Sequence, residues 1–71
     1  MMFNDNLNKY RKQKGLSQEE LAFRLGVSRQ SVSKWESDQS TPELERIIEI
    51  ADLFGISLDE LIGHESNDYV T

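Results

Sequence analysis

The residues with the most distinctive chemistry are four polar side chains that can donate hydrogen bonds and lie within six positions: Arg29, Gln30, Ser33 and Lys34. On a helix with 3.6 residues per turn they point away from Val32 and Trp35, which lie together on the opposite side. In the major groove, arginine pairs with guanine and glutamine with adenine. Lysine can contact guanine there or a phosphate of the DNA backbone. The spacing therefore predicts a surface that contacts DNA bases, with a merely solvated polar helix face as the alternative.

Two short helical patterns position these side chains. The first is expected to run from about Gln18 to Leu25 and the second over residues 28–37, with Gly26 at the turn, where the backbone needs a positive φ. Ser17 and Glu20 have the spacing of a capping box, and Ser28 can cap the second helix. The pattern is that of a helix-turn-helix.

Two longer stretches carry a resemblance to a known family: LSQEELAFRLGVSRQSVSKWE at 16–36 and TPELERIIEIADLFGISLDELI at 41–62. They resemble the XRE-type helix-turn-helix regulators, the family of the phage repressors, and the likeness extends over about residues 3–63. It implies an all-α, five-helix bundle of the lambda-repressor type, a DNA-binding domain spanning 1–63. The helix-turn-helix would occupy 17–37, and residues 64–71 would form a polar tail.

The resemblance also implies roles for individual residues. Bases would be contacted by Arg29, Gln30, Ser33 and Lys34. Phosphates would be contacted by Arg11, Ser17, Gln18, Ser28, Ser37 and Gln39. Arg11 would also form a structural ion pair with Glu36, and we prefer this role to its phosphate contact. The sequence departs from the family at Phe23, where a polar residue is more usual, and near Asp38, where glycine is favoured.

Three further helices complete the expected fold. The first should begin at Asn4 or Asp5 and end at Lys14, with its inward side formed by Phe3, Leu7 and Tyr10. The fourth should run from Pro42 to Phe54 after a Thr41 cap, with core positions Leu44, Ile47, Ile48, Ala51 and Phe54. Its acidic residues should point away from DNA: Glu43, Glu45, Glu49 and Asp52. A capping box of Ser57 and Glu60 should start the fifth helix, with an apolar stripe of Leu58, Leu61 and Ile62.

Four residues are candidates for contact with a second copy or another protein: Phe23, Leu58, Ile62 and Tyr69. Leu58 can equally complete the core, and Phe23 can simply be an exposed aromatic residue. Family analogy favours a homodimer through Ile62 and the tail, which also contains Val70. Its two DNA half-sites would lie about 34 Å apart.

The charge is divided unevenly along the chain. The 71 residues have a net charge of -5, which is unusual for a nucleic-acid-binding domain. Residues 1–34 contain seven basic and three acidic side chains, a net charge of +4. Residues 35–71 contain one arginine and ten acids, a net charge of -9. The N-terminal half can therefore face DNA, with weak non-specific binding that is sensitive to salt.

Other functional classes find little support in the sequence. It contains no cysteine, and we see neither a signal core nor an apolar run long enough to span a membrane, so we expect a cytoplasmic protein. His64 stands alone, and no catalytic motif, metal site or cofactor site is evident. We therefore expect a sequence-specific, double-stranded DNA-binding transcriptional regulator, a repressor acting as a homodimer on a palindromic operator, and not an enzyme. The alternative is an antitoxin-like or protein-interaction module whose acidic half binds a partner protein.

Overall fold

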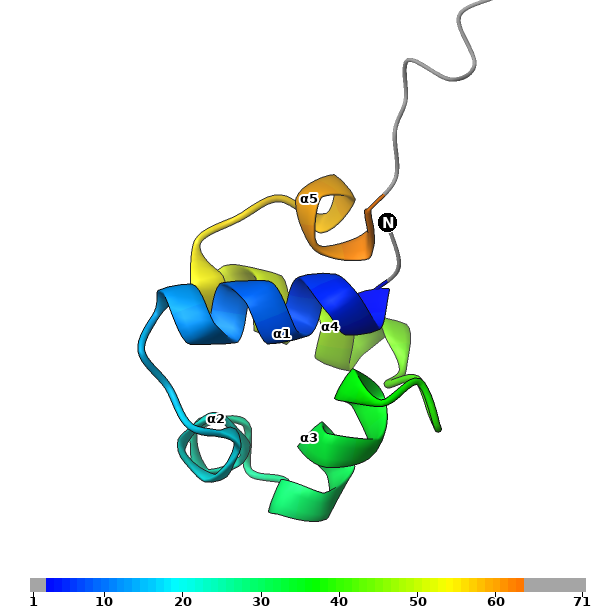
Figure 1. Cartoon of the computed structure of the whole chain (residues 1–71). Coiled ribbons are helices and arrows are strands. Elements are labelled where there is room, and N and C mark those ends of the chain that lie inside the picture. Colours follow the sequence, from blue (N-terminus) through cyan, green and yellow to red (C-terminus); the bar gives the residue numbers. More distant parts are fainter. Residues whose placement is uncertain (1–2, 64–71) are drawn as a thin grey trace, which may run out of the picture.

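Five helices follow the apolar periodicity of the sequence in the computed structural model, which describes residues 3–63. They are α1 (Phe3–Gln13), α2 (Gln18–Leu25), α3 (Arg29–Glu36), α4 (Leu44–Phe54) and α5 (Leu58–Ile62). Figure 1 shows α1 crossing the molecule between α5 on one side and the α2–α3 pair on the other. The described residues contain no strand, and the predicted all-α, five-helix fold is confirmed.

Local capping explains where α2 and α3 begin. The Ser17 hydroxyl accepts a hydrogen bond from the Glu20 backbone N–H at 3.0 Å, and the Ser17 N–H donates to the Glu20 carboxylate at 2.8 Å. This is the predicted capping box. The Ser28 hydroxyl accepts from the Ser31 N–H at 3.1 Å. Gly26 ends α2 in the left-handed conformation with a φ of 72°, so both predicted caps and the turn are confirmed.

The beginning of α4 differs from the prediction. The helix starts at Leu44, its N-cap is Glu43, and no side chain caps it. Pro42 is buried instead of occupying the first helical position, and Glu43 is extended with a ψ of 159°. Because the backbone is still extended at Glu43, the helix begins at Leu44, two residues later than expected. The prediction of Thr41 as the cap is therefore wrong.

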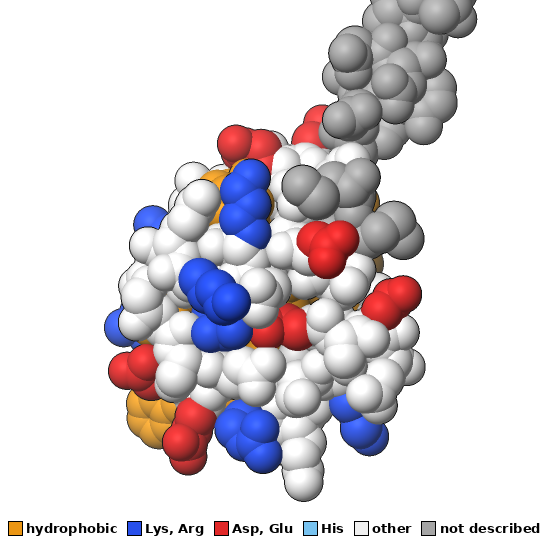
Figure 2. Space-filling model, viewed as in Figure 1, with side chains coloured by type: hydrophobic (Ala, Val, Ile, Leu, Met, Phe, Trp, Pro, Cys, Tyr) orange, Lys and Arg blue, Asp and Glu red, His pale blue; other side chains and the backbone are white. Residues whose placement is uncertain are grey.

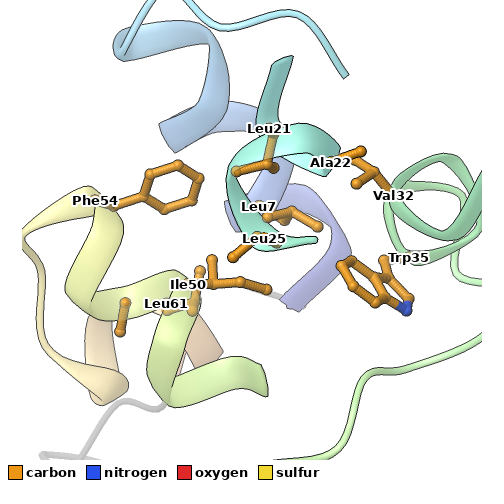
Figure 3. Close-up of a cluster of buried hydrophobic side chains, with 10 residues drawn as sticks. Leu7, Leu21, Ala22, Leu25, Val32, Trp35, Ile50, Phe54 and Leu61 are labelled. Atoms are coloured by element: carbon orange, nitrogen blue, oxygen red, sulfur yellow. The ribbon is translucent and has the colours of Figure 1, made fainter. Parts of the chain in front are cut away.

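The core receives side chains from all five helices (Figure 3). Its fully buried members include Leu7 of α1, Leu21 of α2, Val32 of α3, Ile50 of α4 and Leu61 of α5, all 0% exposed. Trp35 is 8% exposed, as its spacing from Val32 predicted. A buried polar contact accompanies the apolar ones: the Asn6 amide donates to the Leu61 carbonyl oxygen at 3.1 Å and ties α1 to α5.

Two of the core positions predicted on α4 are wrong. Leu44 is 62% exposed and Ile48 is 41% exposed, whereas Ile50, which was not predicted, is fully buried. The helix has two overlapping apolar stripes. Packing against α5 and the rest of the core buries the stripe that contains Ile47, Ile50, Ala51 and Phe54, and the other is left at the surface.

Candidate nucleic-acid interface

The exposed side of α3 presents the predicted base-contacting side chains. Arg29, Gln30 and Lys34 are exposed and Ser33 is half-buried, because Val32 and Trp35 turn the opposite side into the core. Within residues 3–63, the side chains of Arg29, Gln30 and Lys34 make no hydrogen bond or ion pair with other protein groups. Their donors are therefore available to an external acceptor.

Basic side chains lie over α1 and along the edge formed by α2 and α3, with carboxylates among them (Figure 2). The two helices are packed against each other, and the Val27 N–H donates to the Ala22 carbonyl oxygen at 2.9 Å in the turn between them. This bond follows the left-handed Gly26 and closes the C-terminal end of α2. The turn thus fixes the angle at which α3 leaves α2.

The carboxylate of Glu36, at the end of α3, is a meeting point for three helices. Arg11 of α1 donates to it twice, from Nε to Oε2 at 2.6 Å and from Nη2 to Oε1 at 3.1 Å. Asn8 of α1 and Gln18 of α2 each donate to Oε1 at 3.0 Å. Only 11% of the Arg11 side chain and 6% of the Glu36 side chain are exposed. The arrangement holds α1 and α2 against the C-terminal end of α3.

Electrostatics favour the ionised form of Glu36. Burial by itself raises the pKa of this carboxyl group, but the hydrogen bonds from Arg11, Asn8 and Gln18 outweigh it and bring the pKa below its ordinary value. The pKa of Glu20 is also lowered, chiefly by its hydrogen bond from the Ser17 backbone N–H. Both carboxylates are therefore ionised at neutral pH.

Three of the five guanidinium N–H groups of Arg11 donate hydrogen bonds within the protein. Besides its two bonds to Glu36, it donates from Nη1 to the Leu16 carbonyl oxygen at 2.7 Å. All three guanidinium nitrogens thus have an internal acceptor. The geometry favours the structural role of Arg11, and its phosphate contact stays a prediction.

The other predicted phosphate-contacting side chains differ in how far they are already engaged. The hydroxyls of Ser17 and Ser28 accept backbone hydrogen bonds, and a hydroxyl can donate while it accepts. The Gln18 amide donates to Glu36, so one of its two N–H groups is used. Ser37 donates to the Lys34 carbonyl oxygen at 3.3 Å and accepts from the Gln39 amide at 2.9 Å.

We did not predict from the sequence that residues of α1 other than Arg11 contact Glu36. The Asn8 amide reaches Glu36, as described above, and the Asn4 amide lies 3.5 Å from the Glu36 carbonyl oxygen. Residues 4, 8 and 11 share one side of a helix, since they are separated by four and three positions. This spacing is the signal that could have revealed a polar stripe facing α3.

The loop after α3 contains a strained position. Asp38 has a φ of 64°, in the left-handed region that glycine adopts without cost. The resemblance described above led us to expect a glycine near this position. Aspartate tolerates the conformation better than most residues, so the loop can keep this shape despite the departure.

The predicted partner-contacting residues fall into three groups. Phe23 is 85% exposed on α2 and Ile62 is 39% exposed at the end of α5. Leu58 is partly buried and packs against the core. Tyr69 lies outside the described residues, as do His64, Val70 and the rest of the predicted tail.

Comparison with known proteins identifies relatives of this chain. A helix-turn-helix family model matches residues 7–61. The transcriptional activator BcrR of Enterococcus faecalis is 43% identical over 65 residues, which cover 92% of this chain and 32% of that protein. The cryptic phage CTXphi transcriptional repressor RstR of Vibrio cholerae is 35% identical over 68 residues, covering 96% and 61% respectively. The chain thus spans less than two thirds of the length of these curated relatives.

A solved structure has the same fold. The crystal structure of the P22 c2 repressor in complex with a synthetic operator superposes with a TM-score of 0.83 over 92% of this chain and 98% of that chain. The sequence identity is 23%, so this likeness concerns the fold alone. It confirms the phage-repressor type of helical arrangement expected from the sequence.

Proposed function

The chain belongs to the helix-turn-helix family of XRE-type, phage-repressor-like transcriptional regulators, and from this premise we propose that it binds double-stranded DNA in a sequence-specific manner. The family is one of DNA-binding regulators and not of enzymes. The observation that supports sequence specificity is the outer side of α3, where long donor side chains lie exposed over a well-packed apolar side.

In the proposed complex, α3 enters the major groove. Gln30, the second residue of α3, points most directly away from the buried Val32 and Trp35. Arg29 precedes it at the beginning of the helix, and Ser33 and Lys34 follow one turn further along. Gln30 would make its two hydrogen bonds to an adenine, and Arg29 its two to a guanine. Each such pair contributes about 1 to 3 kcal/mol of discrimination against the wrong base.

Phosphate contacts would set the position of α3 in the groove. The beginning of α2 has unpaired backbone N–H groups and a partial positive charge, and the Ser17 hydroxyl and the second N–H of Gln18 lie beside them. Ser28, Ser37 and Gln39 would supply further donors around α3. These groups contact the backbone and do not distinguish one sequence from another.

We propose further that the protein is a repressor and acts as a homodimer on a palindromic operator. Of the two relatives described above, RstR is a transcriptional repressor and BcrR is a transcriptional activator. Repression is the simpler mechanism, because a protein bound over a promoter blocks access without any further activity. Ile62, exposed at the end of α5, and the segment 64–71 would contribute to pairing. The protein would act in the cytoplasm, where it has access to promoter DNA.

Selection from a random pool of duplex DNA tests this proposal directly. We expect an enriched motif with two-fold symmetry and half-sites about 34 Å apart. Failure to enrich any motif at low ionic strength would contradict sequence-specific binding. Enrichment of a single unpaired half-site would contradict the homodimer but not DNA recognition.

A matched pair of glutamine variants then tests the role of α3. Gln30→Ala should weaken binding to the selected site by about 1 to 3 kcal/mol and relax the preference at one base pair. Gln13→Ala removes an exposed amide from the end of α1 and should leave both affinity and preference unchanged. Equal effects of the two variants in fluorescence anisotropy titrations would argue against base contact by Gln30.

A further inference from the structure

The exposed side of α4 carries an apolar strip that the fold leaves uncovered. Leu44 and Ile48 are separated by one helical turn, so their side chains are neighbours on the same side of the helix. They are 62% and 41% exposed. Neither is needed to complete the core, because Ile47, Ile50, Ala51 and Phe54 occupy the buried side.

An acidic row runs beside this strip. Glu45 and Glu49 are one turn apart, and Asp52 continues the line of Leu44 and Ile48 by one more turn. All three acids are exposed. We call the five residues Leu44, Glu45, Ile48, Glu49 and Asp52 the α4 surface. It combines an apolar strip with an adjacent negative row.

Acids outnumber basic residues in the segment that contains the α4 surface, and its single arginine pairs with one member of that surface, Glu49. Residues 43–62 contain six acids and a single arginine, Arg46. Arg46 donates from Nη1 to the Leu25 carbonyl oxygen and to the Glu49 carboxylate, both at 2.8 Å. The arginine therefore braces α4 against the end of α2 and pairs with one of the acids. Glu45 and Asp52 make no ion pair within residues 3–63.

We propose that the α4 surface docks a basic amphipathic helix of a partner protein. Apolar side chains of the partner one turn apart would pack on Leu44 and Ile48, while its lysines or arginines would face Glu45, Glu49 and Asp52. Charge complementarity selects this occupant, because Glu45 and Asp52 are exposed and make no ion pair within residues 3–63. If two copies of this chain instead joined through the α4 surface with antiparallel helices, their acidic rows would lie side by side and repel. The inference is independent of the proposed DNA recognition, since none of these residues belongs to α3.

The test uses a defined probe in place of the natural partner. The probe is a synthetic helical peptide of about 18 residues, long enough to be partly helical alone, with leucine one turn apart and lysine on the adjoining side. A control peptide has glutamate in place of lysine. We expect binding of the basic peptide only, weakened by added salt, with NMR amide shift changes concentrated in residues 44–52.

Surface variants assign the binding to the α4 surface. L44S/I48S should weaken peptide binding about tenfold or more, as expected for central apolar contacts. E45Q/E49Q should weaken binding and reduce its salt dependence. Phe23→Ser, which removes an exposed aromatic from α2, is the matched control and should bind as the wild type does. A variant with alanine at Arg29, Gln30 and Lys34 should lose DNA binding and still bind the peptide.

Three results would overturn the proposal. One is equal peptide binding by L44S/I48S and the wild type. Another is a set of amide shift changes confined to helices other than α4. The third is self-association through this surface: sedimentation equilibrium would show a wild-type dimer that L44S/I48S converts to a monomer, and the peptide would not compete with it. Because Trp35 is buried, a fluorescence emission maximum at the wild-type wavelength establishes that each variant is folded.

Discussion

Replacing Arg11 with methionine should destabilise the domain strongly, because it leaves a buried carboxylate without its cationic partner. The Glu36 side chain is 6% exposed. Removing one member of a buried ion pair costs about 3 to 5 kcal/mol. The lower end applies here, about 3 kcal/mol, because Asn8 and Gln18 still donate to the carboxylate. A core in a chain of this length supplies roughly 3 to 5 kcal/mol in total, so the variant should be close to unfolding at 25 °C.

The matched double variant separates this effect from a loss of packing. Arg11→Met combined with Glu36→Leu removes both charges and leaves no carboxylate to be buried alone. Buried ion pairs replaced by apolar residues of similar volume are often neutral in stability. The double variant should therefore be more stable than Arg11→Met alone, by about 1 kcal/mol or more.

Urea unfolding followed by fluorescence measures both variants and the single substitution Glu36→Leu, which completes the double-mutant cycle. Trp35 is the single tryptophan and is 8% exposed at the end of α3, so its emission reports the packing of the helix that contains Glu36. The reasoning is refuted if Arg11→Met lowers the unfolding free energy by less than about 1 kcal/mol. It is also refuted if the double variant costs the sum of the two single substitutions.

Three further predictions concern pH, the turn and a cap. Because the pKa of Glu36 is lowered in the folded state from its ordinary 4.5, its stabilisation is complete at pH values well above 4.5 and is lost as the pH falls through the folded pKa. The decrease in urea midpoint between about pH 5 and 3 should be smaller in Glu36→Gln, and an equal decrease would contradict this assignment. In Gly26→Ala the added Cβ would have no atom within 4 Å, so the substitution affects stability only through the backbone φ of 72°. It should cost about 1 kcal/mol and lower the thermal midpoint by about 4 to 8 °C, whereas an unchanged midpoint would argue against backbone strain. Ser17→Ala removes the cap of α2 and should cost about 1 kcal/mol in urea unfolding, while Ser17→Asp, which keeps an acceptor, should lose less.

Much of the fold was predictable because its signals are local. The capping box of Ser17 and Glu20 and the left-handed Gly26 depend on residues within four positions of each other. The same applies to the division of α3 into a buried side, with Val32 and Trp35, and an exposed side. These features follow from helical period and hydrogen-bonding groups alone, so they could be derived before any tertiary contact was known.

Distant contacts decided the rest. On α4, Leu44 and Ile48 fit an apolar stripe as well as Ile47 and Ile50 do, and only packing against other helices selects which is buried. That helix begins at Leu44, after an extended Glu43, and Pro42 before it is buried against the rest of the domain. Asn8 and Gln18 meet at Glu36 although 28 and 18 positions separate them from it. Periodicity determines which residues share a side of a helix, but the direction in which that side points depends on neighbours far along the chain.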